Sequence, residues 1–208
     1  MNVRKLCITF SVVLISILLT GIGVAIFVEC GLGSDTLTVL LQGLHKSFNI
    51  SFGTASRICN SILLLLALLI SRKKIGLTTV IFTLTVGYAI DFVYPFIQSL
   101  VIPTYTFIMK IGMILIAQLC FALCYSILIQ YQKGMHSIDA IIYFFVNKFK
   151  VPYILGRTII DITFTISGLL LGGVAGIGTI IACCTTGIMV DCFLIVVRYK
   201  RMPYNSSI

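Results

Sequence analysis

The sequence has few charged residues and no tryptophan. Only 10% of its 208 residues are charged, six of them acidic against 15 lysines and arginines, while 59% are hydrophobic. Soluble domains carry about 25% charged residues, so this chain has too few polar side chains to cover a soluble core. The shortage excludes an ordinary soluble enzyme, a secreted disulfide scaffold and a disordered tail. It predicts an integral membrane protein.

Patterns for catalysis and for metal binding are also missing. His45 and His136 lie in polar connections, and no Ser-His-Asp or Cys-His arrangement suits nucleophilic catalysis. Most cysteines fall in apolar runs, where thiols pack as small hydrophobic groups, and Cys120 with Cys124 lacks further metal ligands. The glycine run 172–178 has no following Lys-Ser/Thr and is not a phosphate loop. We therefore expect no enzyme activity, catalytic residue, metal or cofactor.

Six apolar stretches are long enough to form membrane-spanning helices, because a helix needs about 20 residues to cross a hydrocarbon core of ~30 Å. They cover residues 6–29, 52–71, 75–97, 104–130, 153–173 and 176–198. Two connections, 34–49 and 137–150, begin with Ser and Asp and end near Lys, which suits a short helix. We expect these two to be interfacial or re-entrant helices. Two tilted half-spans, giving eight crossings, are the alternative.

The net charge of +9 predicts an orientation and not a nucleic-acid partner, because the basic residues gather between the apolar runs. They precede the first span, follow the sixth, and separate spans two from three and four from five, whereas residues 98–103 and 172–175 have none. The positive-inside rule then places both termini in the cytoplasm. Tyrosines replace tryptophan as interfacial anchors, namely Tyr94, Tyr105, Tyr131, Tyr153 and Tyr199.

The two halves of the chain, 1–102 and 103–208, align when shifted by 100 residues. Nine identities occur across 57–93, including Arg57 with Arg157 and Asp91 with Asp191; chance would give roughly three in such aliphatic sequence. Each half holds three spans and one short helix, so the second copy enters the membrane from the opposite side. The sequence therefore predicts an all-α polytopic membrane protein with a 3+3 inverted repeat. Such repeats are typical of transporters and channels, although a duplicated scaffold without transport fits as well.

Small and charged residues in the spans are the candidate functional residues. Glycines on one face of the third and sixth spans predict close helix packing: Gly76, Gly87, Gly176 and Gly187. Helical spacing and the repeat predict two mirrored Arg–Asp clusters, an outer one of Asp35, Arg57 and Asp91 and an inner one of Asp139, Arg157, Asp161 and Asp191.

Two interpretations of these clusters stay open. They are structural ion pairs that hold the short helices, or they line a pathway as gates or ligands. A carboxylate there would bind protons if burial raised its pKa, and an arginine would clamp a carboxylate or phosphate.

The same residues resemble the YczE/YitT-like integral membrane proteins of bacteria. The resemblance rests on Gly-Leu-Gly-Ser-Asp at 31–35, on Arg57 at the start of the next span, on the Gly87/Asp91 pair, and on second-half residues from Gly134 to Asp191. It implies a multi-pass protein of the bacterial plasma membrane and no settled substrate.

We expect a small secondary transporter or permease that rocks one half against the other. Asp91 and Asp191 would be its coupling or gating carboxylates, with Arg57 and Arg157 as their partners. The alternative is a non-transporting membrane component that assists a partner protein's assembly or function. The expected partners are the lipid bilayer and a small solute or ion; a protein partner or second copy is left open, and no nucleic acid is expected.

Overall fold

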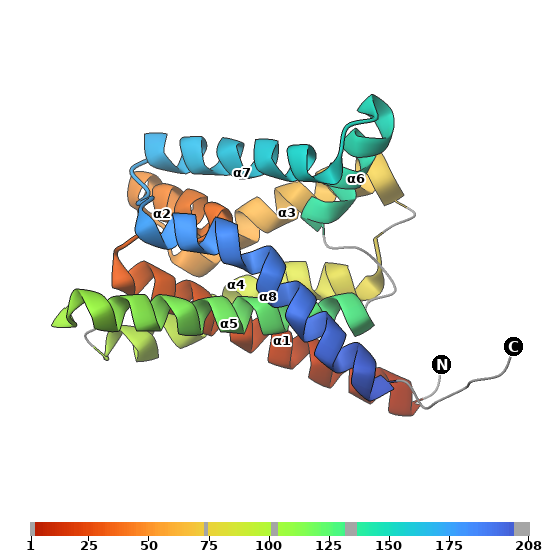
Figure 1. Ribbon diagram of the computed structural model, residues 1–208, viewed down its shortest axis with the longest axis horizontal. Helices are drawn as coiled ribbons and strands as arrows, with labels where there is room; N and C mark the ends of the chain where they lie inside the picture. Colours follow the sequence, from red (N-terminus) through yellow and green to blue (C-terminus); the bar gives the residue numbers. More distant parts are fainter. Residues whose placement is uncertain (1–2, 73–74, 101–103, 132–136, 202–208) are drawn as a thin grey trace, which may run out of the picture.

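The chain is all-helical over the residues that its computed structural model describes, 3–72, 75–100, 104–131 and 137–201 (Figure 1). The helices are α1 (Val3–Cys30), α2 (Thr36–Phe48), α3 (Phe52–Ser71), α4 (Leu77–Gln98), α5 (Phe107–Tyr131), α6 (Ser137–Phe149), α7 (Tyr153–Leu170) and α8 (Ile177–Arg201). Each coincides with one predicted helix to within roughly three residues at its ends, which is close to the uncertainty of helix boundaries. The prediction of the helices is confirmed.

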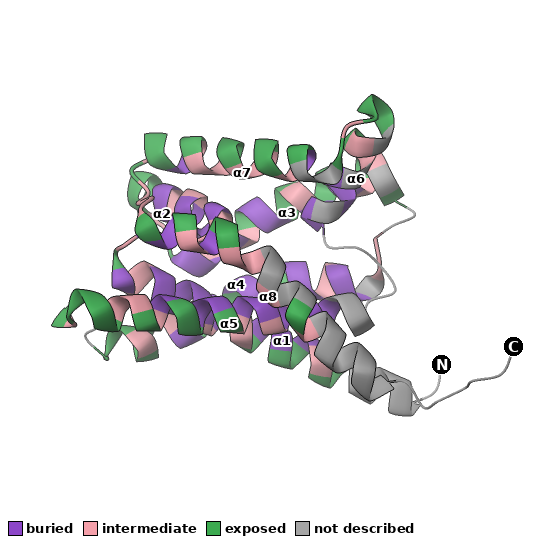
Figure 2. Ribbon diagram, viewed as in Figure 1, coloured by how far each residue is buried: buried purple, intermediate pink, exposed green. Residues whose placement is uncertain are grey.

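Four helices of the described part are long and apolar enough to cross a membrane. Their apolar stretches are Phe10–Cys30 in α1, Phe52–Ile70 in α3, Thr78–Gln98 in α4 and Phe107–Leu128 in α5. Large hydrophobic side chains are exposed along the outer faces of the helices (Figure 2), and such extended apolar surface is rare on soluble monomers. The chain is therefore a membrane protein. In α8 the apolar stretch is shorter, Ile177–Thr186.

The helices of the two halves are interleaved. Helix α1 packs on α4 and α5, and α5 packs on α8; we call these four helices the core group. Helix α2 packs on α7, and α3 packs on α6; we call α2, α3, α6 and α7 the second group. In Figure 1 the second group fills the upper part of the view, α1 and α5 the lower part, and α8 crosses diagonally.

Each group thus contains two helices from each half of the sequence. The largest buried cluster belongs to the core group and includes Phe27, Ile90, Ile114 and Phe121. Helices α3 and α4 pack together and join the two groups. The sequence halves are therefore not separate bodies, and a rocking motion of one half against the other would break the α1–α5 and α2–α7 contacts.

Candidate functional site

Arg57 on α3 and Asp91 on α4 form an ion pair, with Nη1 3.3 Å from Oδ2. The backbone N–H of Gly53 donates to Asp91 Oδ1 at 2.8 Å, and the Ser51 hydroxyl donates to Oδ2 at 3.0 Å. Ser51 is the N-cap of α3 and Gly53 lies in its first turn, where unpaired N–H groups and the helix dipole favour an anion. Both oxygens of Asp91 are therefore satisfied, and the carboxylate caps α3.

Arg57 is held by two further contacts. Its Nη2 donates to the Thr54 hydroxyl at 2.6 Å, and its guanidinium lies 4.3 Å from the centre of the Tyr88 ring. Gly87, predicted for helix packing, lies directly against Gly53, and a Cβ on either residue would overlap the carbonyl oxygen of the other. This close backbone approach brings Asp91 to the start of α3. The arrangement explains the Arg57–Asp91 pair as a structural joint between α3 and α4.

Arg157 and Asp161 form the second ion pair, one turn apart on α7, with Nε 3.0 Å from Oδ2. The Thr36 hydroxyl on α2 donates to Asp161 Oδ1 at 2.7 Å. Asp161 thus ties the start of α2, from the first half of the chain, to α7 from the second half.

The sequence analysis predicts that Asp35 lies with Arg57 and Asp91. In the structure it lies beside the Arg157–Asp161 pair instead. The charges that act on its carboxylate are those of Arg157 and Asp161. The reason is that α2 packs chiefly on α7. There Gly43 of α2 lies against the backbone of Gly168, and Gly168 lies against the backbone of Val39. Glycine contacts between the halves therefore decide where Asp35 lies.

The carboxylate of Asp35 is incompletely paired. Asp35 occupies the N-cap position of α2 with an extended backbone (φ −61°, ψ 157°). Its side chain makes no capping hydrogen bond of regular geometry, although the hydroxyl and backbone N–H of Thr38 act on the carboxylate as hydrogen-bond donors. Its Oδ1 is fully buried and has no hydrogen-bond partner within the described ranges. Burial raises the pKa of Asp35 above its usual value, and the negative charge of Asp161 adds to this, while Thr38 and Arg157 act in the opposite direction.

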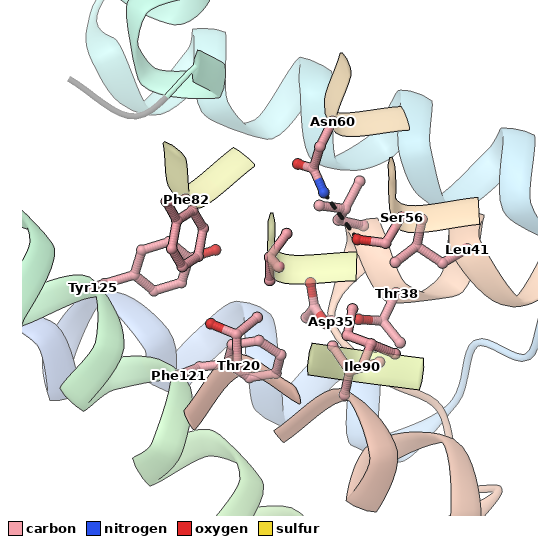
Figure 3. A pocket seen from close by; sticks show the side chains of 13 residues that line it. Thr20, Asp35, Thr38, Leu41, Ser56, Asn60, Phe82, Ile90, Phe121 and Tyr125 are labelled. Atoms are coloured by element: carbon pink, nitrogen blue, oxygen red, sulfur yellow. Dashed lines mark hydrogen bonds between the residues drawn. The ribbon is translucent and has the colours of Figure 1, made fainter. Parts of the chain in front are cut away.

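Asp35 lines a cavity of about 30 Å³ between the core group and the second group (Figure 3). The other lining residues are Thr20, Val24, Leu37, Thr38, Leu41, Ser56, Asn60, Phe82, Val86, Ile90, Phe121 and Tyr125. Since a buried water needs roughly 10–15 Å³ measured in this way, the cavity has room for about two waters.

The cavity has a polar side and an aromatic side. Thr38, Ser56 and Asn60 come from the second group, and the Asn60 amide donates to the Ser56 hydroxyl at 3.0 Å. Phe82 and Tyr125 come from the core group and lie across the cavity from Asn60 and Ser56 (Figure 3). The lining is thus mostly apolar, with a few polar groups. The sequence analysis missed Thr20, Thr38, Ser56 and Tyr125, whose only signal was polarity within or beside apolar helices.

The remaining residues that the sequence analysis singled out do not belong to the two ion pairs or to the cavity, or they lie outside the described part of the chain. Gly76 is the N-cap of α4, and Gly176 lies against the carbonyl of Leu32, just before α8 begins. The structure does not describe the side chains of Asp139 and Asp191 or the surroundings of Gly187. Among the described residues no group of three or more His, Cys, Asp or Glu is placed to hold a metal ion.

The comparisons with known proteins place the chain in a family. A family model described as a family of unknown function, DUF6198, matches residues 7–194. The chain belongs to this family.

Two curated relatives are similar along nearly their whole length. The uncharacterized protein YyaS of Bacillus subtilis is 25% identical over 92% of this chain and 94% of its own length. An uncharacterized protein of Haemophilus influenzae is 27% identical over 95% of this chain and 88% of its own length. No solved structure matches. Neither the family description nor the relatives' names mention YczE or YitT, so that resemblance stays a prediction.

Proposed function

We propose that the chain is a small secondary transporter, or permease, of the bacterial plasma membrane. The observation that carries this proposal is the buried, unpartnered Oδ1 of Asp35 in the cavity between the helix groups. A buried ionised carboxylate is costly unless it has a partner or water. A purely structural aspartate would be expected to use both oxygens, as Asp91 does. An ion or solute that binds at Asp35 would offset the cost.

Six membrane spans complete the proposed architecture, with both termini in the cytoplasm. In addition to the four apolar helices, α7 exposes an apolar stripe at helical spacing, formed by Ile159, Ile162, Ile166 and Leu170. Its 18 residues reach about 27 Å as a helix, close to the hydrocarbon thickness. We propose that α7 faces lipid along this stripe and that α8 is the sixth span.

The helix contacts support an inverted 3+3 repeat. In such a repeat, α1 to α4 correspond to α5 to α8, so contacts recur with their partners exchanged. The α3–α4 contact has no comparable counterpart between α7 and α8 in the described part of the chain, but others do. The α2–α7 contact has its counterpart in α6–α3, and the α1–α4 contact in α5–α8. By the same correspondence Asp139 is the counterpart of Asp35.

The contacts also suggest which parts move. Because the cavity lies between the core group and the second group, we propose that these two groups move relative to each other and open it alternately. This replaces the predicted rocking of sequence halves. Asp35 takes the coupling role that the sequence analysis gave to Asp91, and the Thr36–Asp161–Arg157 contacts position it. No enzymatic step and no cofactor are proposed.

Uptake into proteoliposomes tests the proposal. Radiolabelled amino acids, sugars, organic cations and inorganic anions would be offered in turn under imposed ion gradients. Wild type is expected to accumulate at least one class. Asp35→Asn should reduce its rate at least about tenfold, and Gly112→Ala, at an exposed glycine with open space around it, should not. Absence of uptake for every class, with a stoichiometric protein partner retained in mild detergent, would contradict transport and favour the accessory function.

A further inference from the structure

Among the side chains that the structure describes, the charges around the cavity do not balance. Of the elements that pack around Asp35, α7 contributes Arg157 and Asp161, and α8 contributes the Cys183 thiol within electrostatic range. Helix α5 contributes the Tyr125 phenol, whereas the cavity linings from α1, α3 and α4 have no ionisable side chain. When both aspartates are ionised, this group holds two negative charges and one positive charge.

The excess negative charge belongs to Asp35. Arg157 pairs directly with Asp161 at 3.0 Å, and Thr36 donates to the other Asp161 oxygen at 2.7 Å. Asp161 is therefore matched in charge and in hydrogen bonds. Asp35 shares the charge of Arg157 with Asp161, and its Oδ1 accepts no hydrogen bond within the described residues. One monovalent cation or one proton would neutralise the cluster.

The size and lining of the cavity select between these ligands. At about 30 Å³ the cavity is far smaller than the roughly 300–1,000 Å³ of usual small-molecule pockets. Hard metal cations require six or more oxygen ligands distributed around them. Here the core group lines the cavity with Phe82, Val86 and Phe121 and adds two oxygens, the Thr20 hydroxyl and the Tyr125 phenol, so apolar groups cover much of the side that faces Asp35. A proton needs a single oxygen, and apolar surroundings favour the neutral acid that it forms.

We infer that Asp35 is a proton-binding site and that the proton is the coupling ion of the transporter. The coupling role rests on the proposed function, whereas proton binding does not. A proton passes from water to Asp35 Oδ1, the carboxylate becomes a neutral acid, and the same proton returns to water on release. The neutral acid lets the two helix groups close over an uncharged cavity. Ionised Asp35 leaves an unpaired charge, which favours a cavity open to water.

Infrared difference spectroscopy during a pH titration tests this site in wild-type protein held in lipid nanodiscs. The carbonyl band of a protonated carboxylic acid should disappear with a midpoint above the usual aspartate pKa of about 3.9. Asp35→Asn should abolish this band, and Asp35→Glu should restore it at a shifted midpoint. Asp91→Asn is the matched control and should keep it, because both Asp91 oxygens accept hydrogen bonds in the joint between α3 and α4. A band that persists in Asp35→Asn, with the protein monodisperse, would overturn the site.

Sodium and uptake measurements separate the remaining outcomes. Replacing choline by sodium in the titration should leave the midpoint unchanged, and a midpoint lowered by sodium would assign the site to a metal cation instead. Uptake that depends on Asp35 but not on a pH gradient would contradict proton coupling, while the proposal that the chain is a transporter would stand. An infrared band that depends on Asp35, without uptake of any solute class, would contradict the transporter function, while the proton-binding site would stand.

Discussion

Asp35 and Asp91 show that two aspartates of similar sequence setting have different physical roles. Asp91 receives a backbone N–H, a hydroxyl and a guanidinium, so its charge is stabilised where it stands. Asp35 has a buried oxygen without a donor. Burial without full pairing is the condition that raises the pKa of a carboxylate.

Asp35→Asn should change how stability depends on pH. The pKa of Asp35 is raised in the folded protein and is about 3.9 in the unfolded chain, so the folded state binds the proton more tightly. The resulting stabilisation of wild type is fully present below pH ~3.9 and is lost as the pH rises through the folded pKa. Thermal unfolding from pH 4 upward should show wild type losing stability relative to Asp35→Asn. Parallel curves for the two proteins would refute the raised pKa.

Asp91→Asn should destabilise the fold. The substitution removes charge-assisted hydrogen bonds and the ion pair with Arg57, and the expected loss is about 1–3 kcal/mol. Thermal or denaturant unfolding in detergent measures it. If Asp91→Asn kept full stability but lost transport, Asp91 would regain the gating role that its sequence position suggests.

At the scale of helices, composition predicts the elements but not their partners. Apolar run length and the Ser/Asp starts of the two short segments predict all eight helices to within a few residues. The partner of α2 does not follow, because an amphipathic helix can bury its apolar face against any apolar neighbour. What selects α7 is the fit between Gly43 and Gly168. These two glycines lie outside the periodic stripes from which packing was predicted.

Alanine at the glycine crossings should weaken the helix contacts. A Cβ at Gly53 would overlap the Gly87 carbonyl, and a Cβ at Gly168 would lie 2.6 Å from the Val39 carbonyl oxygen. Gly53→Ala and Gly168→Ala should each lower the free energy of unfolding by about 1–3 kcal/mol through overpacking. Gly112→Ala has nothing within 4 Å and should be neutral or stabilising by up to about 1 kcal/mol. Equal effects at all three positions would contradict close packing at the crossings.

At the scale of the whole molecule, the interleaving of helices from the two sequence halves limits what the sequence alone can predict. The Arg57–Asp91 and Arg157–Asp161 pairs follow from helical spacing and from the repeat. The position of the Asp35 cavity does not follow from helical spacing or the repeat, because its walls come from α1 to α5 and the charges near it come from α7. Contacts between distant segments leave little periodic signal in one sequence.

Reporter fusions test the proposed topology. Alkaline phosphatase, which is active outside the cytoplasm, and a fluorescent protein, which folds inside, would be fused after residues 100 and 135. We expect the first site to be external and the second cytoplasmic, because three spans precede the first and four precede the second. Both sites in one compartment would contradict the inverted repeat.

The most direct test of the account is the charge displaced when proteoliposomes on a solid-supported membrane receive a sudden pH step in the absence of solute. Proton binding at Asp35 should give wild type and Gly112→Ala a transient current, and Asp35→Asn should give no more current than empty liposomes. An undiminished current in Asp35→Asn would contradict the central claim that this carboxylate binds the proton.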